Sequence, residues 1–162
     1  MIDRKPFKLN HRDLIEVIRK TPIASIDLII ENTRNQILLG LRKNAPAKDY
    51  WFVPGGRILK DESIPRAFER IAKDELGINL AHEKANFIGV FEHWYPDNFT
   101  QKQKASTHYI VLAHHIKITD APLESPDDQH EQYKWFDKSS LLKDKKVHPY
   151  TKAYFEKPQL IQ

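Results

Sequence analysis

The sequence predicts a single α+β sandwich in which strands dominate and one prominent helix lies near the middle of the chain. Its 162 residues are the length of one ordinary domain. Most apolar segments are short and strand-like, and only residues 63–76 combine a long helical periodicity with clear start and stop signals. No repeat, low-complexity tract or linker divides the chain, so residues 1–162 form one domain.

Each element follows from a local pattern. Apolar residues at helical spacing predict a short helix over 11–20, which Thr21-Pro22 ends. The apolar run 23–30 is expected to form a hairpin with 36–41. The remaining predicted elements are strands at 51–53, 86–95, 107–118 and 133–136, the helix at 63–76, and a helix that begins at 138–142.

Composition limits the possible functions. Apolar residues make up 40% of the chain, which is enough for a packed core. There is no cysteine, so disulfides are excluded and any metal must bind oxygen or imidazole. The net charge of +4 suits an anionic ligand, but the basic residues are dispersed, so we expect no nucleic-acid partner. No apolar run suggests a membrane span or a signal peptide, and a cytoplasmic protein is expected.

The central helix has a recognisable beginning and end. Ser63 is a suitable N-cap, and Pro65 falls in the first turn, where its missing N–H costs little. Gly77 is a suitable C-terminal residue. The residues expected to face the sheet are Ile64, Phe68, Ile71 and Ala72.

Glu75 is the residue that this pattern does not explain. It follows Ile71 by four positions, so it projects at the edge of the apolar stripe, and the helix dipole disfavours an anion in the last turn. A half-buried carboxylate there needs a cation beside it. Periodicity alone favours equally a salt bridge to lysine or arginine and a hard divalent metal.

The spacing of six residues matches the Nudix box, a 23-residue glycine-loop-helix pattern that here spans 56–78. They are Gly56, Glu62, Arg70, Glu75, Gly77 and Ile78. The chain therefore resembles the Nudix hydrolases. That resemblance implies a Nudix fold, with a mixed β-sheet sandwiched between helices. It also implies Mg²⁺-dependent hydrolysis of a nucleoside diphosphate linked to another group.

The box departs from the usual pattern in one informative way. Ile71 stands where the family commonly has a metal-binding glutamate, and Asp74 is a shortened version of another. Fewer carboxylates hold fewer metals, which weakens the case for the usual attack of water at phosphorus. Asp74 nevertheless keeps open a second metal and a conventional pyrophosphatase.

The chain also resembles the GDP-mannose mannosyl hydrolases, which share this departure. The segments that carry the resemblance include YWFVPGGR at 50–57, DNF at 97–99, THY at 107–109 and DQH at 128–130. The resemblance implies hydrolysis of GDP-mannose, or GDP-glucose, by water at the anomeric carbon with inversion. His130 would be the general base. Gly55, Glu75 and Gln129 would hold one Mg²⁺, for which Mn²⁺ can substitute.

The same resemblance assigns the substrate contacts. Arg42 and Arg57 would clamp the diphosphate, and Tyr109 would donate to it. Arg70, which orients acidic side chains in the family, is also a candidate substrate contact. Ordinary alternatives remain for several of these residues, because Tyr109 also suits a core aromatic position and the arginines suit solvated strand ends.

Asp27 and His93 would lie near the sugar. For Asp27 the alternative is a carboxylate beside a turn or interface, and for His93 it is a satisfied core histidine. Members of the subfamily are commonly homodimers. Two rival functions remain open, a phosphorus-attacking pyrophosphatase acting on ADP-ribose or another nucleotide sugar, and a non-catalytic nucleotide-sugar-binding module.

Overall fold

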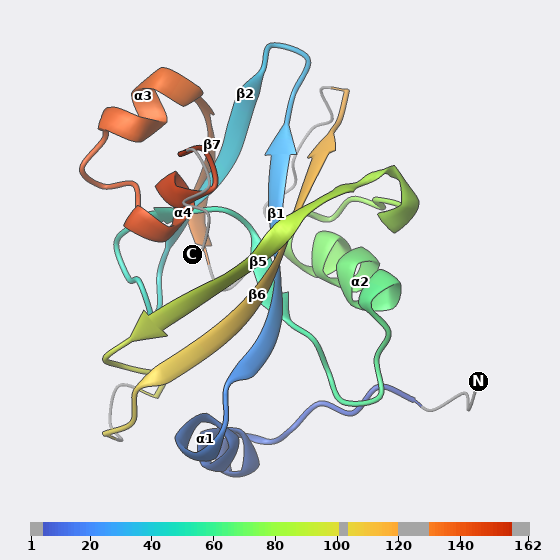
Figure 1. Cartoon of the computed structure of the whole chain (residues 1–162), viewed down its shortest axis with the longest axis vertical. Coiled ribbons are helices and arrows are strands. Elements are labelled where there is room, and N and C mark those ends of the chain that lie inside the picture. Colours follow the sequence, from blue (N-terminus) through green and yellow to red (C-terminus); the bar gives the residue numbers. More distant parts are fainter. Residues whose placement is uncertain (1–4, 101–103, 120–129, 157–162) are drawn as a thin grey trace, which may run out of the picture.

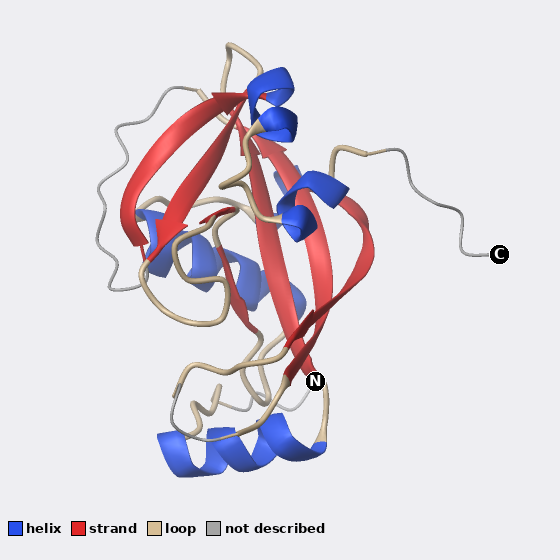
Figure 2. Ribbon diagram, turned by 90° about the vertical axis from the view of Figure 1, so that its left-hand side faces the viewer, coloured by secondary structure: helices blue, strands red, loops and turns tan. Residues whose placement is uncertain are grey.

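A mixed β-sheet between helices forms the body of the molecule. The computed structural model describes residues 5–100, 104–119 and 130–156. Helix α2 (Ile64–Leu76) covers one face of the sheet, and α3 (Lys138–Lys143) and α4 (Pro149–Ala153) cover the other (Figures 1 and 2). Helix α1 (His11–Lys20) lies at one end. The predicted α+β sandwich is therefore confirmed.

The sheet has one parallel pair of strands at its centre. Its main path runs β3-β2-β1-β6-β5, with β4 paired to β1 and β7 paired to β2. Strands β1 and β6 are parallel, and the other pairs are antiparallel. The strands are β1 (Ile23–Glu31), β2 (Gln36–Arg42), β3 (Trp51–Phe52), β4 (Gly55–Arg57), β5 (Asn86–Tyr95), β6 (Thr107–Lys117) and β7 (His130–Asp137).

Alternation along β1 separates two cores. Ile26 and Leu28 pack with Phe68 and Ile71 of α2. Ile29 faces the opposite side, where the cluster includes Leu141 of α3 and Tyr154, the residue that ends α4. Because successive side chains on a strand point to opposite faces, Asp27 falls on the α4 side of the sheet.

Most predicted boundaries agree with the structure to within one or two residues. Ser63 caps α2 by accepting a hydrogen bond from the Arg66 N–H, and Gly77 ends the helix in the left-handed conformation at φ 69°. The strand expected at 133–136 begins earlier, at His130, because it pairs with β2 through to Arg42. No helix in the described ranges is long and apolar enough to cross a membrane.

Three elements were not predicted: strand β4, helix α4 and the short 3₁₀ helix η1 (His82–Lys84). Strand β4 carries two glycines, which give no strand signal, but it pairs with β1 directly after Pro54. Helix α4 has only five residues, too few to show a periodic pattern. The segment before α4 is held by backbone hydrogen bonds to β3, from Trp51 N–H to Lys146 C=O at 2.8 Å and from His148 N–H to Trp51 C=O at 3.1 Å.

Candidate active site

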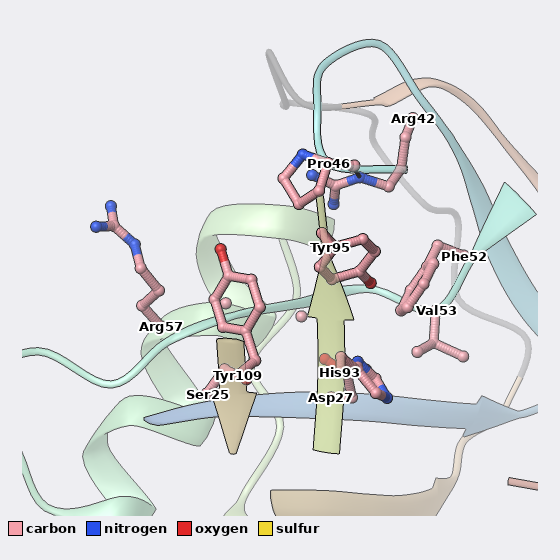
Figure 3. Close-up of a pocket in the computed structure, with 12 residues that line it drawn as sticks. Ser25, Asp27, Arg42, Pro46, Phe52, Val53, Arg57, His93, Tyr95 and Tyr109 are labelled. Atoms are coloured by element: carbon pink, nitrogen blue, oxygen red, sulfur yellow. Dashed lines mark hydrogen bonds between the residues drawn. The ribbon is translucent and has the colours of Figure 1, made fainter. Parts of the chain in front are cut away.

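One pocket, on the face of β1 away from α2, collects most of the predicted site residues. Strands β1, β2, β4, β5 and β6 each supply at least one of its side chains or glycines (Figure 3). The predicted residues that line it are Asp27, Arg42, Gly55, Arg57, His93 and Tyr109. Residues from distant parts of the chain thus share one cavity, which Glu75 does not line.

Asp27 and His93 form a buried polar pair at one end of the pocket. Asp27 is 7% exposed and His93 3% exposed. Burial raises the pKa of Asp27 to about 7, although a hydrogen bond from Tyr154 and the charge of Arg42 oppose the shift. Burial, with a smaller effect of His148, lowers the pKa of His93 to about 3. His93 is therefore a neutral imidazole at physiological pH.

Two arginines and a tyrosine form the other end. In Figure 3 Arg42 and Arg57 lie on either side of Tyr109, away from Asp27 and His93. The Nε of Arg42 donates to the carbonyl of Pro46 at 2.8 Å, which fixes this side chain over the loop after β2. Burial lowers the pKa of Arg57 and raises that of Tyr109. A bound anion would stabilise the charged guanidinium of Arg57 and would accept a hydrogen bond from the neutral hydroxyl of Tyr109. One end of the pocket suits an anion and the other suits hydroxyl groups.

Gly55 lies where no side chain fits. A Cβ at this position would stand 2.5 Å from Oδ1 of Asp27 and 2.7 Å from the carbonyl oxygen of Ile26. The neighbouring Gly56 packs against α2, where an added Cβ would stand 3.1 Å from Cγ1 of Ile71. The two glycines therefore let β4 lie closely between β1 and α2.

Glu75 follows Ile71 by one helical turn, so it projects from the same side of α2 toward β4. It is 4% exposed, and its backbone carbonyl accepts a hydrogen bond from the Tyr133 hydroxyl of β7 at 3.0 Å. A buried carboxylate beside a side-chain-free backbone offers the oxygen donors that Mg²⁺ prefers. Among the described residues no three His, Cys, Asp or Glu side chains gather in a group that could hold a metal ion.

Of the predicted pair Gln129 and His130, the structure describes the backbone of His130 and does not describe Gln129. The backbone of His130 begins β7, and its Cα pairs with that of Arg42 across the ladder with β2. Gln129 lies outside the described residues. Since Arg42 lines the pocket and Tyr133 contacts the end of α2, the backbone of β7 runs from the pocket toward Glu75.

Arg70 does not line the pocket. Its guanidinium donates to both carboxylate oxygens of Glu62, at 2.7 and 2.9 Å, and to the carbonyl of Arg57 at 2.9 Å. Asp74, whose side chain is 61% exposed, lies 3.4 Å from the same guanidinium. Arg70 thus ties the loop before α2 to the helix, which agrees with an orienting role, and its contact with the substrate stays a prediction.

Replacing Arg70 with alanine should therefore destabilise the protein. The Glu62 side chain is 2% exposed and would lose its ion-pair partner, at a cost of about 1–3 kcal/mol in the free energy of unfolding. Urea unfolding measures this loss. The exposed Arg66→Ala is the matched control and should change stability by less than about 0.5 kcal/mol. A normal unfolding midpoint for Arg70→Ala, with weakened substrate binding, would instead identify a substrate contact.

The depressed pKa of His93 predicts a pH-dependent stability. The unfolded imidazole titrates near pH 6.5 while folded His93 stays neutral to about pH 3, so the unfolded state gains a proton first as pH falls. His93 therefore lowers the free energy of unfolding between those two pH values, by up to about 1.4 kcal/mol per pH unit.

His93→Phe keeps an aromatic ring beside Tyr150 and removes this titration. Its stability relative to the wild type should rise as pH falls from 6.5 to 4, measured by urea unfolding with EDTA present. His148, whose pKa burial lowers to about 4, and Asp27, whose pKa burial raises, remain in both proteins, so the difference between the two curves reports His93 and its coupling to these groups. Parallel stability curves would contradict the prediction.

Sequence reasoning missed the residues that surround the buried pair. Phe52 and Tyr95 line the pocket, and Tyr150 and Tyr154 approach it from α4. Phe52 belongs to the YWFVPGGR segment, but the sequence did not show that its ring lines the pocket, where it packs against His93 and His148. The two α4 tyrosines come from a segment with no motif, and only the tertiary structure brings them to the site.

Comparison with known proteins identifies a consistent set of similarities. The family model described as the NUDIX domain matches residues 21–157. The low-salt glycan biosynthesis protein Agl8 of Haloferax volcanii is 36% identical over 140 residues, which span 86% of this chain and 84% of that protein. An ADP-ribose pyrophosphatase of Methanocaldococcus jannaschii is 31% identical over 122 residues, 75% of this chain and 66% of that protein.

The solved structures agree on the fold. The MutT protein of Methanosarcina mazei superposes with a TM-score of 0.67 at 20% sequence identity, over 84% of this chain and 92% of that one. At this identity the similarity shows a shared fold alone. The mixed sheet and its flanking helices therefore match those of MutT-like proteins.

Proposed function

The chain belongs to the Nudix family of hydrolases, and on that basis we propose that it hydrolyses a nucleotide sugar, with GDP-mannose the first candidate, by attack of water at the anomeric carbon. The observation that carries the proposal is the division of the pocket. Arg42 and Arg57, on either side of Tyr109, offer donors to an anion, and the buried Asp27 and His93 offer hydrogen-bonding groups to hydroxyls. A sugar joined to a diphosphate has both features in one molecule.

The state of the box carboxylates favours carbon over phosphorus as the site of attack. Ile71 is buried at 1% exposure in the α2 core, Glu62 is held by Arg70, and Asp74 is largely exposed. Glu75 is thus the box carboxylate that is buried beside β4. A water nucleophile at phosphorus is usually activated by more than one metal, whereas a leaving group needs only charge stabilisation.

The chain's own residues would act as follows. Arg42 and Arg57 bind the diphosphate and stabilise the negative charge that grows as it departs. Glu75, the Gly55 carbonyl and Gln129 would hold the divalent cation that the family generally uses, and Mg²⁺ bound there supplies further positive charge to the diphosphate. Asp27 and His93 hold the sugar by its hydroxyls.

His130 would accept a proton from water as the oxygen bonds to the anomeric carbon. The carbon–oxygen bond to the β-phosphate breaks, and its electron pair leaves with GDP. No acid is needed at the leaving oxygen, because a diphosphate departs as an anion. The products are GDP and a free sugar of inverted configuration, formed through an oxocarbenium-like transition state as in glycoside hydrolysis.

The names of the relatives support two candidate substrates. A glycan biosynthesis protein fits a sugar nucleotide, and an ADP-ribose pyrophosphatase fits the rival reaction. A panel of GDP-mannose, GDP-glucose, UDP-glucose and ADP-ribose with Mg²⁺ separates them. We expect GDP and free mannose from GDP-mannose. Hydrolysis of ADP-ribose to AMP and ribose 5-phosphate, with GDP-mannose left intact, would overturn the proposal. Binding without any turnover would identify a non-catalytic module.

A further inference from the structure

Tyr154, the C-cap residue directly after α4, reaches the buried end of the pocket from the far end of the sequence. Its hydroxyl donates to Oδ2 of Asp27 at 2.6 Å, and it lies 3.3 Å from Nε2 of His93. The tyrosine is 8% exposed, and its ring packs edge-on against Phe91 with the ring centroids 4.7 Å apart. This contact therefore belongs to the core of the protein as well as to the site.

The proton arrangement in this group follows from counting donors. A tyrosine hydroxyl has one proton, and the short bond to Asp27 uses it. The hydroxyl oxygen can then accept from Nε2 of His93, at 3.3 Å, in the tautomer that carries the single ring proton of the neutral imidazole on Nε2. His93, Tyr154 and Asp27 thus form one chain of hydrogen bonds that ends at Oδ2 of the carboxyl group.

The other oxygen of Asp27 faces the backbone of Gly55, which lines the pocket as Asp27 does. Oδ1 is the atom that a side chain on Gly55 would strike, at 2.5 Å, and Asp27 lines the cavity there. With Oδ2 held by Tyr154, the carboxyl group cannot turn about its last bond without breaking the 2.6 Å hydrogen bond. Oδ1 is therefore kept in one orientation before any ligand binds.

Helix α4 is also attached to the edge of the sheet by a second tyrosine, whose hydroxyl does not bond to Asp27. One turn earlier, the Tyr150 hydroxyl accepts from the Trp94 N–H at 3.0 Å and donates to the Trp94 carbonyl at 2.9 Å. The Tyr150 ring stacks on His93 with centroids 4.2 Å apart and 4° between the planes. The sheet edge, the helix and the buried pair form one unit.

We propose that Tyr154 is a positioning residue, whose hydroxyl orients Asp27 so that Oδ1 receives a hydrogen bond from a hydroxyl group on the sugar of the substrate. The inference rests on the proposed function, because it assigns the sugar to the Asp27 end of the pocket. It predicts that Tyr154 affects the sugar and its reaction, and leaves the diphosphate, held by Arg42 and Arg57, unaffected.

Tyr154→Phe removes the hydroxyl and keeps the ring against Phe91. For GDP-mannose we expect kcat to fall about 10- to 100-fold, as is typical when an outer partner of a site ligand is lost. The dissociation constant for GDP with Mg²⁺, measured by calorimetry, should stay within about twofold. In an Asp27→Asn background, Tyr154→Phe should have almost no further effect on kcat, because the group that it positions is already changed.

Tyr150→Phe is the matched control, since it removes a hydroxyl from the same helix that bonds to backbone and not to Asp27. It should lower the unfolding temperature and leave turnover within about threefold. Two results would overturn the positioning role while the proposed function stands. One is that Tyr154→Phe lowers kcat by the same factor in the wild-type and Asp27→Asn proteins. The other is that it weakens GDP binding by as large a factor as it lowers kcat. A wild-type protein that releases no GDP from GDP-mannose would overturn the proposed function, and this inference with it.

Discussion

Replacing Glu75 by glutamine is expected to lower kcat on GDP-mannose by about 10²- to 10³-fold, the usual effect of losing one main electrostatic contact to a charged transition state. The carboxylate is buried in the last turn of α2, one helical turn after Ile71, which packs against Gly56 of β4. A neutral amide of the same size attracts a divalent cation more weakly. The variant should therefore also need a higher Mg²⁺ concentration for half-maximal rate, which a magnesium titration of the GDP-release rate measures.

The neighbouring acidic residue provides the matched control. Asp74→Asn removes one negative charge at an adjacent position, but its side chain is 61% exposed and faces Arg70. We expect its rate to remain within about threefold of the wild type. If Asp74→Asn were as damaging as Glu75→Gln, a second metal and the phosphorus-attack mechanism would be favoured instead.

His130→Asn is expected to lower kcat by about 10²- to 10⁴-fold, because general-base catalysis by a positioned side chain contributes that much to rate. Asparagine cannot accept the proton of the attacking water at neutral pH. The KM for GDP-mannose should change little, since the diphosphate contacts of Arg42 and Arg57 remain. His11→Asn, at the exposed start of α1, should leave the rate unchanged.

The pH–rate profile provides a second measurement of the same role. An imidazole usually titrates between pH 5 and 8, and a protonated imidazole cannot act as a base. The wild-type rate should therefore fall on the acid side of this interval. A flat profile from pH 5 to 8, or a His130→Asn variant with nearly full activity, would exclude His130 as the base.

The central helix could be predicted because local chemistry specifies its ends, whereas the box was recognised by its resemblance to a known family. Ser63, Gly77 and the apolar stripe give a helix between fixed ends, and the structure shows both caps. Asp27 was identifiable as an exception within an apolar strand, and it does lie on the face opposite Ile26 and Leu28. The helix was predictable because its residues fit a local pattern, and Asp27 was identifiable because it breaks one.

The support for that site could not be read from the sequence. Tyr154 meets Asp27 across 127 positions, and nothing near Tyr154 suggests a partner. Strand β4 is defined by its pairing with β1 rather than by any preference of glycine for strands. Such contacts depend on how the sheet and α4 pack, which is a property of the whole fold.

Hydrolysis of GDP-mannose in ¹⁸O-labelled water, followed by mass spectrometry of both products, tests the central claim most directly. Attack at the anomeric carbon places the new oxygen on the sugar, so we predict labelled mannose and unlabelled GDP. Label in a phosphate group, whether in GDP or in GMP and mannose 1-phosphate, would show attack at phosphorus and contradict the account.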